Sequence, residues 1–248
     1  MGSIYVMWIR QLKRYYRSKP RMLSQLAQPL LFLVGLGFGF GPVYARAGGG
    51  DYIQYLTPGI IAMSVMFTSV FIGIEVIWDR QFGFLKEILV APVSRMRIMI
   101  GRTLGGATIA LFQGLLIFLI TLAIGFRPVN WLIVPVAFIF MFLIAVMFTA
   151  FGTAIASKFQ DMQSFPVITN FIIMPLFFLS GALFPVDGIS SILATIVRFN
   201  PLAYGVDGLH QVLTATSTFT LFADFSVLIA VSLAFFAIGA YFFSKIEL

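Results

Sequence analysis

Side chains able to carry acid–base, nucleophilic or metal chemistry are scarce in this 248-residue chain. Cysteine is absent and His210 is the single histidine, which excludes a disulfide scaffold, a thiolate zinc site and a multi-histidine metal site. There is no Gly-Lys pair, hence no Walker A phosphate loop, and neither Gly-x-Ser-x-Gly nor His-Glu-x-x-His occurs. We predict no catalytic residue, metal or cofactor on this chain, so the energy for its work comes from elsewhere.

One carboxylate, Glu75, lies clearly within a long apolar run, and Asp224 begins another. A proton- or sodium-coupled carrier usually has ionisable groups near the membrane midplane, and no such set is visible. Glu75 is either a paired or snorkelling structural carboxylate near the cytoplasmic interface or a gate residue on that side. Asp207 and His210 either cap a helix or contribute to a gate on the outer face.

The elements that position these groups are membrane helices. The chain is 60% apolar and 10% charged, with a mean hydropathy of +1.01, against about 45–50% and 25% in a soluble domain. A spanning helix needs about 20 mostly apolar residues. We therefore predict an all-α membrane protein with six spans in one transmembrane domain. The spans are Met22–Gly41, Pro58–Trp78, Thr103–Gly125, Trp131–Ala156, Phe165–Phe184 and Phe222–Phe243.

The basic residues predict the orientation. With both termini inside, 13 of the 16 Lys and Arg residues face the cytoplasm and three face outward, as the positive-inside rule requires. The net charge of +7 is then explained by basic residues that face the anionic lipids of the cytoplasmic leaflet, and it does not indicate binding to nucleic acid.

Two cytoplasmic segments are amphipathic. In residues 1–21 an apolar face of Tyr5, Trp8, Leu12 and Tyr15 opposes a basic face, which predicts a helix in the membrane surface. In the loop 79–102, Leu85, Ile88 and Leu89 repeat at helical spacing before Pro92. That apolar strip either lies on the membrane or enters a groove on another protein.

On the outer face, residues 185–221 contain two further amphipathic stretches. The apolar positions of the first follow helical spacing from Ile189 to Val197, and Asn200-Pro201 then reads as the cap and first residue of a second helix, Pro201–Leu213. Both are too short to cross a bilayer, which predicts a re-entrant or interfacial pair.

Three stretches resemble the membrane subunit of the ABC-2 class of ATP-binding-cassette exporters, the group of the daunorubicin-type drug, Nod-factor and O-antigen polysaccharide exporters. Gly83–Arg95 is similar to the family pattern G-T-L-E-x-L-x-x-x-P-x-S-R, with one extra residue before the glutamate. Phe178–Pro185 resembles the family's end of span five, and Asn200–Leu209 its N-P-x-x-Y-x-x-[D/E] motif. Gln81, Phe84 and His210 depart from the usual Glu, Thr and Arg, which leaves the subfamily open.

The resemblance implies a homodimer of this chain above two cytoplasmic ABC ATPase subunits, which hold the ATP and Mg²⁺. It also implies that the loop is a coupling helix docked on the ATPase. The residues it would use there are Leu85, Glu87, Ile88, Leu89, Pro92 and Arg95. On the outer helix the motif residues are Asn200, Pro201, Tyr204 and Asp207.

Spans one, two and five are expected to line the path between protomers, with helix packing as the alternative role of their polar residues. The candidates are Gln25, Gln28, Thr68, Ser69, Thr169, Asn170 and Ser180.

The expected function is ATP-driven export of an amphipathic drug-, lipid- or glycolipid/polysaccharide-like substrate across the cytoplasmic (inner) membrane of a prokaryote. An ATPase-independent carrier or channel, and a membrane-embedded assembly factor, are the alternatives.

Overall fold

Every regular element in the part of the chain that the structure describes is a helix. The computed structural model describes residues 2–85, 88, 93–159, 164–186 and 190–245. Its helices are α1 (Gly2–Arg17), α2 (Lys19–Arg46), α3 (Tyr52–Gln81), α5 (Arg95–Ile124), α6 (Val134–Lys158), α7 (Ser164–Ile168), the π-helical turn η1 (Thr169–Ile173), α8 (Met174–Phe178), α9 (Ser191–Phe199), α10 (Pro201–Thr214) and α11 (Leu221–Ser244).

Five of these helices are long and apolar enough to cross a membrane: α2, α3, α5, α6 and α11. They contain the predicted spans one, two and six and nearly all of spans three and four. Helix α5 ends at Ile124 rather than Gly125, and α6 begins at Val134 rather than Trp131. Within the predicted fifth span, Phe165–Phe184, the helical run α7–η1–α8 stops at Phe178, so Leu179–Phe184 is not helical. Two local causes are visible: the hydroxyl of Ser180 donates to the carbonyl oxygen of Phe177, and Gly181 has a φ of +80°.

Helix α3 is the centre of the bundle and is buried along most of its length. It packs against α2, α5, α6 and α10. Its crossing with α6 is made by two glycines: a Cβ on Gly73 would lie 2.7 Å from the carbonyl oxygen of Thr149, and one on Gly152 would lie 2.8 Å from that of Val70. Backbones that approach this closely need small residues at the contact.

Helix α1 packs on α5 through a second pair of glycines. A Cβ on Gly101 would lie 2.6 Å from the Cβ of Met7, and one on Gly105 would lie 2.8 Å from that of Gln11. The buried residues of α1 are Met7, Gln11 and Tyr15. Of the predicted apolar face, Tyr15 is buried, with its hydroxyl donating to Gln113 of α5, whereas Tyr5 is exposed. The face of α1 that packs on α5 therefore coincides only in part with the predicted apolar face.

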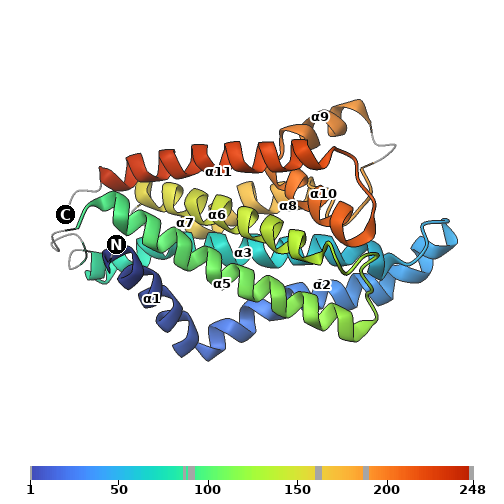
Figure 1. The fold of residues 1–248 in the computed structure, drawn as a ribbon, viewed down its shortest axis with the longest axis horizontal. Helices are drawn as coiled ribbons and strands as arrows, with labels where there is room; N and C mark the ends of the chain where they lie inside the picture. The colour runs from blue at the N-terminus through green and yellow to red at the C-terminus, as the bar shows by residue number, and fades with distance from the viewer. Residues whose placement is uncertain (1, 86–87, 89–92, 160–163, 187–189, 246–248) are drawn as a thin grey trace.

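The bundle has two distinct ends (Figure 1). Both termini and α1 lie at one end, and α9 and α10 lie at the other. Helix α10 covers the predicted helix Pro201–Leu213, and α9 covers most of the amphipathic stretch before it. The bundle thus separates the basic N-terminal segment from the Asn200 motif by the length of its long helices.

Candidate functional site

A cavity of about 650 Å³ lies between α2, α3 and the start of α7. One part of its wall is apolar, with aromatic rings from α3 and α7. The other part is polar and comes mostly from the first turns of α2. The lining residues are Ser18, Pro20, Arg21, Ser24, Gln25, Gln28, Pro29, Phe67, Thr68, Phe71, Ile74, Glu75, Trp78 and Phe165.

The cavity gathers four of the predicted residues: Gln25, Gln28, Thr68 and the candidate gate Glu75. Three of these were predicted as path lining, and they come from α2 and α3, which contain two of the three spans nominated for the path.

The other four predicted path residues lie elsewhere. Ser69 is buried and donates to the carbonyl oxygen of Val65 within its own helix. Ser180 lies in the turn after α8, while Thr169 and Asn170 form the start of η1, where Asn170 is exposed. For Ser69 the helix-packing role is the one that its hydrogen bond supports.

Glu75 belongs to a buried ion network at one side of this cavity. Arg21 at the start of α2 pairs with Glu75, and Arg14 of α1 lies 3.5 Å from the same carboxylate. Arg14 also donates to Asp79 at 2.7 Å, and Arg102 of α5 reaches the other oxygen of Asp79 at 2.5 Å. Five side chains thus tie the last turn of α1, the first turn of α2 and the first part of α5 to the last two turns of α3.

Because this network is buried, removing one of its members should be costly. Asp79 and Arg102 are 1% and 2% exposed. Water does not solvate either charge, so each charge is stabilised by the other. Removing one member of a buried pair typically costs 3–5 kcal/mol, because the remaining charge is uncompensated. The network therefore holds the end of α3, where the loop 82–94 begins, in a defined position.

This network was not predicted from the sequence, although a paired role was one of the two alternatives for Glu75. The basic residues of α1 were expected on the face opposite the apolar one, whereas Arg14 pairs with the carboxylates of α3. A usable signal was present: Glu75 and Asp79 are four residues apart, which places two carboxylates on one face of a helix. Two carboxylates at the end of an apolar helix need cationic partners.

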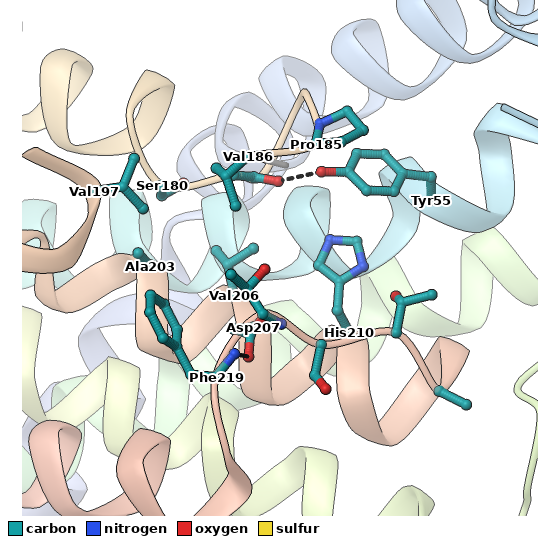
Figure 2. Close-up of a pocket in the computed structure, with 15 residues that line it drawn as sticks. Tyr55, Ser180, Pro185, Val186, Val197, Ala203, Val206, Asp207, His210 and Phe219 are labelled. Carbon is teal, nitrogen blue, oxygen red and sulfur yellow. Dashed lines mark hydrogen bonds between the residues drawn. The ribbon is translucent and has the colours of Figure 1, made fainter. Parts of the chain in front are cut away.

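A second hollow of about 440 Å³ lies at the other end of the bundle, between α10, the turn after α8 and the segment 215–219. Figure 2 shows Tyr55 and His210 facing each other there, and their rings are 4.7 Å apart. Asp207 accepts hydrogen bonds from the backbone N–H groups of Thr218 and Phe219 at 2.7 and 2.9 Å. The carboxylate of Asp207 is therefore committed to holding the α10–α11 connection.

The other motif residues of α10 are also structural. The side-chain oxygen of Asn200 caps the helix by accepting from the N–H of Leu202, and its amide donates to the carbonyl oxygens of Leu176 and Leu179 at the end of α8. Pro201 is the first helical residue, and Tyr204 donates to the carbonyl of Arg198. The capping role expected for this motif is thus present in Asn200, which also joins α10 to α8.

The described part of the loop 82–94 shows where its apolar side chains go. Leu85 is 2% exposed and packs into the core of this chain, with Ile88 partly buried against it. The expectation that Leu85 belongs to an exposed strip is therefore wrong, because the chain itself covers it. Phe82 and Phe84 are the exposed apolar residues. Glu87, Leu89 and Pro92 lie outside the described residues, and Arg95 donates to the carbonyl of Ser244.

His210 leads to a prediction about pH. Burial lowers the pKa of His210 to about 4 from an ordinary value of 6.5, so the folded chain keeps this imidazole neutral while the unfolded chain protonates it. The contribution of His210 to folding stability should fall by about 3 kcal/mol as the pH drops from 6.5 to 4. Unfolding midpoints measured at several pH values should therefore depend on pH differently in the unmodified chain and in His210→Gln, and the difference between the two is this contribution. An equal slope in the variant would assign the effect to other groups.

Comparisons with known proteins agree with this architecture. Residues 2–214 match the family model described as ABC-2 type transporter. Nodulation protein J of Rhizobium leguminosarum bv. trifolii is 29% identical over 213 residues, which cover 83% of this chain and 80% of that protein. The putative transport permease ycf38 of Porphyra purpurea is 27% identical over 243 residues, covering 93% and 84%, and ycf38 of Cyanophora paradoxa is 28% identical over 208 residues, covering 83% and 72%. With five membrane-spanning candidates and a family match over most of its length, this chain is a multi-pass membrane protein of the ABC-2 type transporter family.

Proposed function

We propose that this chain is the permease subunit of an ATP-driven exporter of an amphipathic molecule. The observation that carries the proposal is the cavity between α2, α3 and α7. It combines a polar end with an aromatic wall, and its Glu75 belongs to the ion network that holds the end of α3 before the loop 82–94. A displacement of that loop would be passed to the cavity wall through α3.

The proposed topology has six crossings with both termini in the cytoplasm. Fifteen helical residues, Ser164–Phe178, rise about 22 Å, which is short of the roughly 30 Å hydrocarbon core. The segment Leu179–Phe184 would complete the crossing. Non-helical backbone at membrane depth is tolerated where protein covers it, and Ser180, Ala182 and Leu183 are buried. The common end of the two termini in Figure 1 supports an even number of crossings.

The proposed assembly is a homodimer of this chain with two ABC ATPase subunits, in the inner membrane of a prokaryote. The exposed flank of α2 carries Leu31, Val34 and Phe38, and that of the α7–α8 run carries Val167 and Phe171. These flanks border the cavity and would face a second copy or lipid. The loop 79–102, with Glu87, Leu89 and Pro92, would meet an ATPase, where Mg²⁺ and ATP are bound.

The test is co-expression of the full chain with the candidate ABC ATPase from the same source. We expect a stable complex whose ATP hydrolysis is inhibited by vanadate. Leu89→Asp should lower co-purification or hydrolysis at least about tenfold, since a charge at an interface anchor is costly, whereas Leu89→Met should behave as the unmodified chain. A chain that moves amphiphiles in vesicles without any ATPase would contradict the proposal and favour a carrier or channel.

A further inference from the structure

The polar end of the α2–α3–α7 cavity is electropositive. Among the residues that the structure describes, four guanidinium groups, those of Arg10, Arg14, Arg21 and Arg102, interact with two carboxylates, those of Glu75 and Asp79. These six side chains carry a formal charge of +2. In surroundings with a low dielectric constant such a surplus attracts an anion more strongly than the same charge in water would.

Arg21 is the cation that a molecule in the cavity can reach. Arg21 and Glu75 both line the cavity, whereas Arg14, Asp79 and Arg102 are not among its lining residues. Arg21 is about one-fifth exposed and its guanidinium lies 5.8 Å from the centre of the Tyr15 ring. Its fork of N–H donors is suited to a phosphate or carboxylate, which it can bind through two hydrogen bonds.

Glu75 can release Arg21 without becoming an isolated charge. Its second oxygen has no hydrogen-bond partner among the described residues and lies 3.5 Å from Arg14. When an anion takes the place of Glu75 on Arg21, a small movement of Arg14 gives that oxygen a partner. The exchange therefore replaces one ion pair with another and avoids most of the penalty for an unpaired buried carboxylate.

The part of the cavity wall that comes from α3 and α7 is mostly apolar. Phe67, Phe71, Ile74, Trp78 and Phe165 extend from Glu75 along α3 and across to α7. A charged head at Arg21 would leave an attached acyl or aryl chain in contact with this wall, where burial of apolar surface contributes about 25 cal/mol per Å².

We propose that the cavity binds an anionic amphiphile, a molecule with a phosphate or carboxylate head on Arg21 and an apolar tail on the aromatic wall. This inference rests on the proposed function, because it names the substrate class of the export path. Arg21 is then the residue that selects for charge, and Glu75 is the internal competitor that holds Arg21 when the cavity is empty.

Trp78 offers a direct measurement of binding. The chain has three tryptophans, so a Trp8→Phe, Trp131→Phe background leaves Trp78 as the one emitter. The purified full chain in dodecyl maltoside is titrated with dodecyl phosphate, dodecyltrimethylammonium and inorganic phosphate. We expect saturable quenching by dodecyl phosphate, none by the cationic amphiphile, and at least about tenfold weaker binding of inorganic phosphate, which lacks the tail.

Two variants should move the affinity in opposite directions. Arg21→Gln should weaken dodecyl phosphate binding about tenfold or more, since a charge-assisted hydrogen bond is lost. Glu75→Gln should strengthen binding, because the competitor for Arg21 is removed. Arg17→Gln, an exposed arginine of α1, controls for attraction of the anion to the surface. Unfolding midpoints verify that each variant remains folded.

The inference is overturned if Arg21→Gln and Arg17→Gln bind dodecyl phosphate equally, if Glu75→Gln weakens binding, or if the cationic amphiphile quenches Trp78 equally well. These outcomes are independent of the ATPase. If the complex with the ATPase hydrolyses ATP in a vanadate-sensitive manner but the chain does not bind dodecyl phosphate selectively, only the proposed substrate class is overturned. Selective binding by a chain that associates with no ATPase keeps the site and overturns the exporter.

Discussion

Asp79→Ala should destabilise the chain by about 3–5 kcal/mol, one of the two largest effects that the structure predicts. The variant leaves the guanidinium of Arg102, which is 2% exposed, without its carboxylate, and it also removes the 2.7 Å bond from Arg14. The end of α3 would lose the ion pairs that Asp79 makes with α1 and α5. The measurement is the midpoint of unfolding in dodecyl maltoside, followed by circular dichroism.

The N-cap carboxylate of α3 gives a matched comparison for this prediction. Asp51 is exposed and caps α3 by accepting from the N–H of Ile53, so Asp51→Ala should cost about 1 kcal/mol. The double variant Asp79→Leu, Arg102→Met replaces the pair by apolar residues of similar size and should recover most of the loss. If Asp79→Ala lowered the free energy of unfolding no more than Asp51→Ala does, another group would stabilise the charge of Arg102, and the network would not hold the end of α3.

The long spans could be predicted from the sequence because their signal is local. Twenty or more apolar residues in a row require a helix in a membrane whatever surrounds them, and α2, α3, α5, α6 and α11 follow. The end of the fifth span is different. Leu179–Phe184 is as apolar as the helix before it, and its departure from helix depends on the φ of Gly181 and on contacts with Tyr52 and Tyr55 of α3, which are far away in sequence.

The same distinction divides the candidate site. Gln25, Gln28 and Thr68 could be nominated because polar residues in apolar spans are few, and they do meet at the cavity. Ser69 is also a polar residue in an apolar span, but its hydroxyl donates to a carbonyl oxygen of its own helix. A helix that is buried on all sides has no amphipathic pattern, so the sequence does not show which of its residues face the cavity. The partners of Glu75 could not be predicted, since Arg14 turns inward only when α1 settles on Gly101 and Gly105.

Gly59→Ala should be the other severe substitution. A Cβ at this position would lie 2.0 Å from the carbonyl oxygen of Ala182 and 2.6 Å from its carbonyl carbon. Both atoms are backbone, so the clash cannot be relieved by a rotamer change, and the loss should be near the upper end of the roughly 1–3 kcal/mol typical of overpacking. Gly39→Ala is the control: nothing lies within 4 Å of its Cβ, and alanine favours a helix interior by up to about 1 kcal/mol.

A second substitution separates a local clash from the loss of a structural unit. The segment after α8 is held on α3 by the hydroxyls of Tyr52 and Tyr55, which donate to the carbonyls of Leu183 and Gly181 at 2.8 and 2.7 Å. Tyr52→Phe alone should cost about 1 kcal/mol. If Gly59→Ala pushes the segment away, the Tyr52 bond is already lost in that variant, and the double variant should be less destabilised than the sum of the two. Full additivity would mean that the segment stays in place, and that α3 bends instead to accommodate the methyl group.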